Sequence, residues 1–126
     1  MGAIDELAAA LPDGAVITDP DILETYRYDR TDWLTPGHPA CVVFPRSTAE
    51  VAAAVKVAAT HRMPIVPRGA GSSLAGGSQA IDGSIILCLE RMTQILEIDE
   101  VDQTVTVEPG VINADISLAT APHSRQ

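Results

Sequence analysis

The chain has 126 residues, of which 46% are hydrophobic and 20% are charged, and this length and balance fit one globular domain. Eight Lys and Arg against 17 Asp and Glu give a formal net charge of −9, which repels nucleic acid and anionic membrane surfaces and excludes both as partners. Any phosphorylated ligand must therefore be attracted by backbone N–H groups and by one or two local cations.

Residues 1–39 are interpreted as an N-terminal helical arm. Apolar residues at helical spacing precede Pro12-Asp13-Gly14, which ends the first helix. Asp19 is a favourable N-cap, and Pro20 suits the first position of a second helix. The predicted elements are a helix over 4–11, a strand over 15–18, a helix over 20–26 and a loop over 29–39. We expect Trp33, in that loop, to anchor the arm by packing.

Residues 40–126 are predicted to form a mixed α and β domain. Ser47 and Glu50 form a capping box that opens an Ala- and Val-rich helix, and Asn113 is expected to cap the last helix. The strand–helix–strand order over 40–67 favours a parallel crossover. The predicted elements are strands over 40–44, 63–67, 84–89, 94–99 and 103–108, helices over 48–61 and 114–120, and a glycine-rich loop over 68–83.

The sequence gives no sign of secretion, membrane insertion or metal binding. The N-terminus carries acids, Asp5 and Glu6, where a secretory signal peptide carries bases. Lys56 interrupts the longest Ala/Val segment, so no apolar stretch is long enough to span a membrane. Cys41 and Cys88 have no metal-ligand spacing, and Cys88 is expected to be a buried thiol. We therefore expect a cytoplasmic protein without a metal site.

The loop over 68–83 contains five glycines and is the most informative segment. Glycine lacks Cβ, so it lets backbone N–H groups approach a ligand closely and adopts positive φ without strain. Successive N–H groups in such a turn form a concavity that holds anions. Arg68, directly before the glycines, adds a cation that favours a role in ligand binding; the alternative is an ordinary surface arginine. Ser72, Ser73 and Ser78 add hydroxyl groups, which could instead satisfy the backbone of the turn.

Two common phosphate-binding motifs do not fit this loop. The dinucleotide fingerprint G-x-G-x-x-G fails because Leu74 stands at the position of its third glycine. Gly71, Gly76 and Ser78 match the spacing of a P-loop, but Gly77 replaces the lysine that must meet the nucleotide phosphates. The absent lysine therefore speaks against a module that binds ATP.

Four motifs in a fixed order carry a family resemblance. They are Phe44-Pro45-Arg46-Ser47-Thr48-Ala49-Glu50-Val51, the run from Pro64 to Gly77, Met92, and Val107-Glu108-Pro109-Gly110-Val111. The series closely resembles the FAD-linked oxidases of the vanillyl-alcohol oxidase superfamily, and within it the glycolate oxidase FAD subunit and D-lactate dehydrogenase group. The resemblance implies an α+β fold, with a mixed sheet and flanking helices, in which 40–126 form the first subdomain of a PCMH-type FAD-binding domain.

The resemblance also implies a cofactor site, because the glycine loop of that family wraps the FAD pyrophosphate. Carried over by position, the residues that hold the pyrophosphate are Pro67, Arg68, Gly69, Ala70, Gly71, Ser72, Ser73, Gly76, Gly77 and Ser78, and Gly110 approaches the cofactor. Some members attach FAD through a histidine where this chain has Ser72 or Ser73, so non-covalent FAD is expected. The implied reaction is the oxidation of a 2-hydroxy acid such as glycolate or D-lactate.

Members of the family are several times longer than this chain, although the resemblance covers residues from about 11 to 123. The substrate domain and its catalytic residues would follow residue 126, so no catalytic residue is assigned. We expect a truncated chain that lacks its C-terminal half, binds FAD weakly or not at all when alone, and meets its 2-hydroxy-acid substrate only in the full-length enzyme. The main alternative is a non-catalytic truncated subunit that binds a partner chain.

Overall fold

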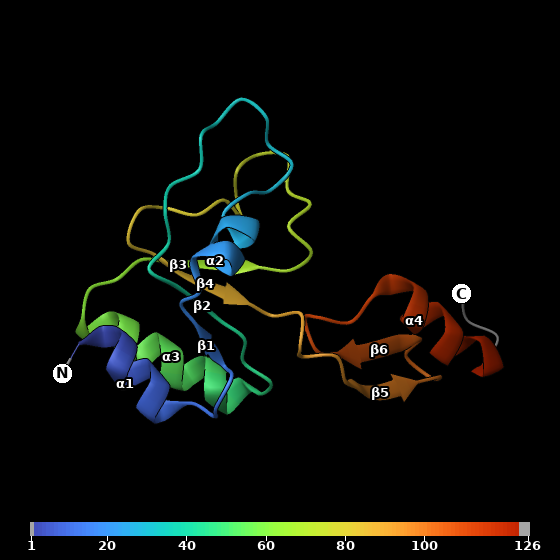
Figure 1. The fold of residues 1–126 in the computed structure, drawn as a ribbon. Coiled ribbons are helices and arrows are strands. Elements are labelled where there is room, and N and C mark those ends of the chain that lie inside the picture. Colours follow the sequence, from blue (N-terminus) through green and yellow to red (C-terminus); the bar gives the residue numbers. More distant parts are fainter. Residues whose placement is uncertain (1, 124–126) are drawn as a thin grey trace.

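The computed structural model describes residues 2–123 and has a mixed α/β fold, as predicted. Figure 1 shows two parts: a sheet flanked by α1, α2 and α3, and a smaller unit made of β5, β6 and α4. The elements are α1 (Ala3–Ala10), β1 (Val16–Ile17), α2 (Pro20–Tyr26), β2 (Cys41–Val43), α3 (Thr48–Thr60), β3 (Ile65–Arg68), β4 (Ile85–Cys88), β5 (Ile95–Asp99), β6 (Thr104–Val107), α4 (Asn113–Thr120) and a 3₁₀ turn (Ala121–His123).

The main sheet has the strand order β1-β2-β4-β3. β4 pairs in parallel with β2 on one edge and with β3 on the other, and β1 pairs antiparallel with β2. The predicted crossover from β2 through α3 to β3 is parallel, but β4, which comes later in the chain, lies between its two strands. Every residue of β2 and β4 is buried, which explains why both strands are continuous apolar runs rather than alternating ones.

The two faces of the main sheet are covered by different helices. α1 and α3 pack against one face, where Leu7, Ala54 and Leu87 belong to one buried cluster. On the other face, Ile86 and Phe44 form a second cluster against which α2 packs. The arm over 1–39 therefore contributes a strand and two helices to the packing of the sheet. The division of the chain at residue 39 remains a prediction.

The predicted N-cap residues are confirmed for α2 and α3 but not for α4. Asp19 accepts a hydrogen bond from the Asp21 N–H at 2.9 Å, and Ser47 Oγ accepts one from the Glu50 N–H at 3.2 Å. The prediction for α4 was wrong: its N-cap is Ile112, and Asn113 is already helical. The helix begins one residue earlier than predicted and has no side-chain cap, and the Asp115 N–H of its first turn donates to the Ile112 carbonyl at 2.9 Å instead.

The smaller unit is the predicted hairpin followed by α4. β5 and β6 pair antiparallel, with an irregularity in register between Ile95 and Glu97. Asp99 Oδ1 accepts from the N–H groups of Val101 and Asp102 at 3.0 Å each, which closes the turn between the strands. The acidic turn is therefore explained by local hydrogen bonding.

Cys41 and Cys88 are both buried free thiols, as expected for Cys88. Burial raises the pKa of the Cys41 thiol to about 11, so this group is protonated at neutral pH. Over residues 2–123, the structure holds no helix with the length and apolar content needed to cross a membrane.

The packing of α1 on the sheet can be tested with one substitution. Leu7 is 0% exposed, so Leu7→Ala should lower the free energy of unfolding by about 2–5 kcal/mol through the cavity that it leaves. Leu118, at 74% exposure, is the matched control, and Leu118→Ala should change stability by less than about 0.5 kcal/mol. Urea unfolding of both variants makes the comparison, and an equally small loss for Leu7→Ala would contradict the packing described.

Candidate functional site

The glycine-rich loop leaves the carboxyl end of β3 and returns to β4. Gly71 has φ +72° and Gly76 has φ +83°, conformations that side chains with a Cβ rarely adopt. Gly69 has no heavy atom within 4 Å of the position that a Cβ would occupy, so its backbone faces open space. Gly83, at the end of the loop, also has a positive φ of +73°, so backbone conformation requires glycine at three positions, and Gly69 leaves room at a fourth.

The glycine loop is fastened to the loop that follows α2. The Arg30 N–H donates to the Ser73 carbonyl at 3.0 Å, and the Gln79 amide group donates to the carbonyls of Thr31 and Leu34 at 3.3 Å each. Figure 1 shows the two loops on the same side of the sheet. Trp33 does not anchor this region as predicted: it is 68% exposed, and hydrogen bonds to neighbouring backbone groups hold the loop.

The three serines of the loop differ in their surroundings. Ser73 Oγ accepts from the N–H groups of Ala75 and Gly77 at 3.3 Å each, so it satisfies the backbone of the turn. Ser78 is buried, whereas Ser72 is exposed. Ser72 is therefore the serine whose hydroxyl group is most open to a ligand.

A cavity of about 460 Å³ brings together two of the segments that the sequence singled out. Gly69 and Ala70 line it from the start of the glycine loop, and Gly110 lines it from the Pro-Gly turn between β6 and α4. The other lining residues are Glu90, Thr93, Pro109, Val111, Ile112, Asn113 and Asp115. Pro67, Arg68 and the loop residues from 71 to 78 are not part of its lining. The volume lies within the range of about 300–1,000 Å³ found for small-molecule sites.

Close packing explains the glycine at position 110. A Cβ there would lie less than 3.0 Å from the carbonyl oxygens of Leu89 and Met92. The Gly110 N–H also donates to the Met92 carbonyl at 2.8 Å. The Pro-Gly turn is therefore pressed against the segment that follows β4, and this contact closes one side of the cavity.

The rim of the cavity is tied to the core through Glu90. Its carboxylate accepts a hydrogen bond from the Tyr26 hydroxyl at 2.9 Å, and the Tyr26 ring packs edge-on against Phe44 at a centroid distance of 5.3 Å. Burial, together with the hydrogen bond and negative charge of Glu90, raises the pKa of Tyr26 to about 12. Tyr26 therefore remains a neutral donor to Glu90 at neutral pH.

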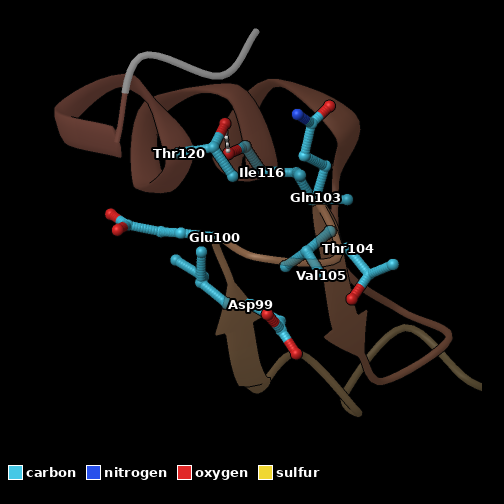
Figure 2. Close-up of a pocket in the computed structure, with 8 residues that line it drawn as sticks. Asp99, Glu100, Gln103, Thr104, Val105, Ile116 and Thr120 are labelled. Atoms are coloured by element: carbon cyan, nitrogen blue, oxygen red, sulfur yellow. Dashed lines mark hydrogen bonds between the residues drawn. The ribbon is translucent and has the colours of Figure 1, made fainter.

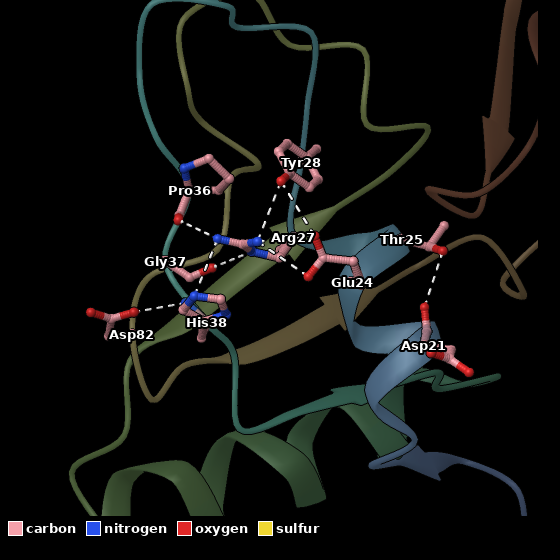
Figure 3. Close-up of polar contacts among 9 residues, drawn as sticks. All are labelled: Asp21, Glu24, Thr25, Arg27, Tyr28, Pro36, Gly37, His38 and Asp82. Atoms are coloured by element: carbon pink, nitrogen blue, oxygen red, sulfur yellow. Dashed lines mark hydrogen bonds and ion pairs between the residues drawn. The ribbon is translucent and has the colours of Figure 1, made fainter.

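Sequence reasoning missed Arg27, which binds backbone carbonyls of the loop that follows α2 (Figure 3). Arg27 is buried and donates to the carbonyls of Pro36 and Gly37 at 2.9 and 3.0 Å and to the Glu24 carboxylate at 3.0 Å. Because a buried charge is costly unless it is paired, loss of these hydrogen bonds would be unfavourable, and the loop is kept next to the end of α2. Its position one residue after a predicted helix is the only signal in the sequence, and it is weak.

A second cavity, of about 180 Å³, lies between the hairpin and α4 (Figure 2). It is lined by Ile98, Asp99, Glu100, Gln103, Thr104, Val105, Ile116 and Thr120, a set with two carboxylates and no cation. His123, beyond α4, contacts the Glu100 carboxylate. No residue of the glycine loop lines this second cavity. In addition, residues 2–123 hold no cluster of three His, Cys, Asp or Glu side chains that could bind a metal ion.

A family model described as an FAD binding domain matches residues 39–126. The chain belongs to this FAD-binding family. It is 37% identical over 113 residues to D-2-hydroxyglutarate dehydrogenase of Stutzerimonas stutzeri, covering 90% of this chain and 24% of that protein. It is 44% identical over 91 residues to the glycolate oxidase subunit GlcD of Bacillus subtilis, covering 72% of this chain and 19% of that protein. The chain thus spans about a quarter of the length of these relatives, or less.

Solved structures agree with the family. The fold matches p-cresol methylhydroxylase with a TM-score of 0.83 and 26% identity, over 97% of this chain and 24% of that one. It matches 4-ethylphenol oxidase from Gulosibacter chungangensis with the same TM-score and 28% identity, over the same shares of the two chains. The predictions of a PCMH-type FAD-binding fold, of the FAD-linked oxidase family and of FAD as the cofactor are confirmed.

The two glycines that line the cavity should respond differently to an added methyl group. Gly110→Ala should lower the free energy of unfolding by about 1–3 kcal/mol, because the methyl group meets backbone oxygens that cannot move aside. Gly69→Ala should leave stability unchanged or slightly raised, because its Cβ enters open space. Thermal unfolding of both variants decides the matter, and similar midpoints would show that Gly110 is not needed for packing.

Proposed function

We propose that the backbone N–H groups of the glycine loop hold the pyrophosphate of FAD. The observation that supports this most directly is the cavity that Gly69, Ala70 and Gly110 line together. The residues proposed to form the site are Pro67, Arg68, Gly69, Ala70, Gly71, Ser72, Ser73, Gly76, Gly77 and Ser78, with Gly110 on the other side. Ser72 and Ser73 offer no imidazole for a covalent bond, so we propose that FAD is held non-covalently.

The lining of the cavity offers no cation, so the proposed binding relies on the backbone. Its lining contains the carboxylates Glu90 and Asp115 and no lysine or arginine. A diphosphate in such surroundings needs N–H dipoles directed at it, and glycine allows them to come close. The exposed backbone of Gly69 and Ala70 supplies such groups at the mouth of the loop.

The proposed reaction is the oxidation of a 2-hydroxy acid by the full-length protein. Two of the relatives are a D-2-hydroxyglutarate dehydrogenase and a glycolate oxidase subunit, and a third is a probable D-lactate dehydrogenase of Danio rerio. Bound FAD supplies the acceptor for a hydride from the substrate. The residues of this chain bind and orient the cofactor, and we assign no catalytic residue among them. We retain a cytoplasmic location as a prediction.

The small unit supports a second candidate function, the binding of a partner chain. Within residues 2–123, β5 and β6 pair only with each other, and a two-stranded sheet is marginally stable by itself. Large apolar side chains are exposed on or beside this unit at Leu96, Val101, Ile112 and Leu118. A polypeptide that supplies further strands and apolar cover would stabilise it.

Partner binding can be tested by complementation. The chain is mixed with the remaining, unmatched part of D-2-hydroxyglutarate dehydrogenase from Stutzerimonas stutzeri, and the mixture is separated by size-exclusion chromatography. Co-elution would support the second candidate, and Leu96→Glu should weaken it because a buried charge is costly. Separate elution at all concentrations would count against it.

The FAD site can be tested on the chain alone. We expect the purified chain to lack stoichiometric yellow cofactor, because part of the site is proposed to come from another segment. Added FAD or inorganic pyrophosphate should still shift the backbone amide NMR signals of residues 69–77 at high ligand concentration. Gly69→Val should weaken this response several-fold by placing a side chain where the ligand approaches.

Ala52→Val, on the exposed side of α3, is the matched control and should leave the response to pyrophosphate unchanged. The proposed site would be overturned if neither FAD nor pyrophosphate shifts the amide signals of residues 69–77 in the wild-type chain. Stoichiometric flavin in the purified chain would instead overturn the expectation of weak binding.

A further inference from the structure

We propose that Arg68 is a positioning residue for the glycine loop, which it fixes from behind rather than by contact with the diphosphate. The inference rests on the proposed function only for the identity of the ligand. Arg68 is the last residue of β3, and the two residues that follow it, Gly69 and Ala70, line the cavity. Arg68 itself does not line it.

One nitrogen of the Arg68 guanidinium is bonded to two backbone carbonyls at the end of α2 and just after it. Nη1 donates to the Tyr26 carbonyl at 3.1 Å and to the Tyr28 carbonyl at 2.5 Å. The guanidinium carbon also lies 5.3 Å from the centroid of the Tyr26 ring, within the range of a cation–π contact. Both hydrogen bonds come from one nitrogen, while the planar guanidinium lies over the Tyr26 ring, and lysine has no planar group to put there.

The backbone of Arg68 is fixed as well. Its carbonyl accepts from the Leu89 N–H at 2.9 Å, and the residue lies opposite Cys88 in the pairing of β3 with β4. Main chain and side chain thus hold Arg68 from two directions. The glycine loop starts from a point whose position and orientation are set by β4 and α2 together.

Gly71 shows that the side chain of Arg68 also shapes the loop. A Cβ on Gly71 would lie less than 3.0 Å from atoms of the Arg68 guanidinium, so this group fills the space beneath the turn. The positive φ of Gly71, +72°, imposes a second and independent requirement for glycine. Arg68 and Gly71 are therefore a matched pair, in which the arginine supports the turn that presents the N–H groups.

The first test compares Arg68→Met and Arg68→Lys in the full 126-residue chain by backbone amide NMR without ligand. Both variants should shift the signals of residues 69–77 and 26–30 and leave those of α1 and α3 in place. Methionine has no donor for the two carbonyls, and lysine lacks the planar group that fills the space beneath Gly71. Both should also weaken the response to inorganic pyrophosphate several-fold. Lysine should not restore it, although it keeps the charge.

A direct phosphate contact gives a different pattern. The proposal is overturned if Arg68→Met leaves the ligand-free signals of 69–77 unchanged while pyrophosphate binding falls and Arg68→Lys restores it. If the wild-type signals do not respond to pyrophosphate at all, the proposed function fails, and the ligand-free shifts of the variants still decide the role of Arg68.

A double-mutant cycle tests the matched pair through stability alone. Gly71→Ala should lower the thermal midpoint through both backbone strain and the clash with Arg68. In an Arg68→Ala background the strain remains and the clash is gone, so the same substitution should lower the midpoint by clearly less. Equal losses in the two backgrounds would show that the two residues do not interact and would contradict the proposal.

Discussion

The structure depends on the burial of β4 between two parallel neighbours. β4 is hydrogen-bonded along both edges and covered on both faces. Its fixed position also fixes where the following segment starts. The glycine loop starts at the adjacent end of β3, and the residues after β4 carry Glu90 and contact Gly110. The cavity therefore forms where the carboxyl ends of two parallel strands meet a turn from the smaller unit.

Much of this fold could be predicted from the sequence because its signals are local. Ser47 and Asp19 cap helices as their side chains require, and the apolar run that contains Cys88 is a buried strand. The insertion of β4 between β2 and β3 could not be predicted, since strand order depends on contacts between distant segments. Asn113 was misplaced because the carbonyl of Ile112 satisfies the first turn of α4 without a side chain.

The site was less accessible to sequence reasoning than the fold. The glycine loop can be recognised from its composition. The sequence does not reveal that Gly110 packs against the Leu89 and Met92 carbonyls, where a Cβ would not fit. Arg27 and Trp33 were missed or misplaced for the same reason: whether a side chain is buried depends on where a long loop folds back. Arg27, at the end of α2, is paired and buried, while Trp33, in the loop that follows, is exposed to solvent.

Pro67 affects whether the open edge of the main sheet can pair with a strand of another copy of this chain. β3 is the outermost strand of the main sheet, and the carbonyls of Pro64 and Arg68 accept hydrogen bonds from β4, so the groups of Pro67 face outward. Proline has no N–H to offer there, and the open edge lacks a donor at its centre. The edge is thus a poor template for intermolecular sheet growth, which protects a newly made chain from aggregation in that direction.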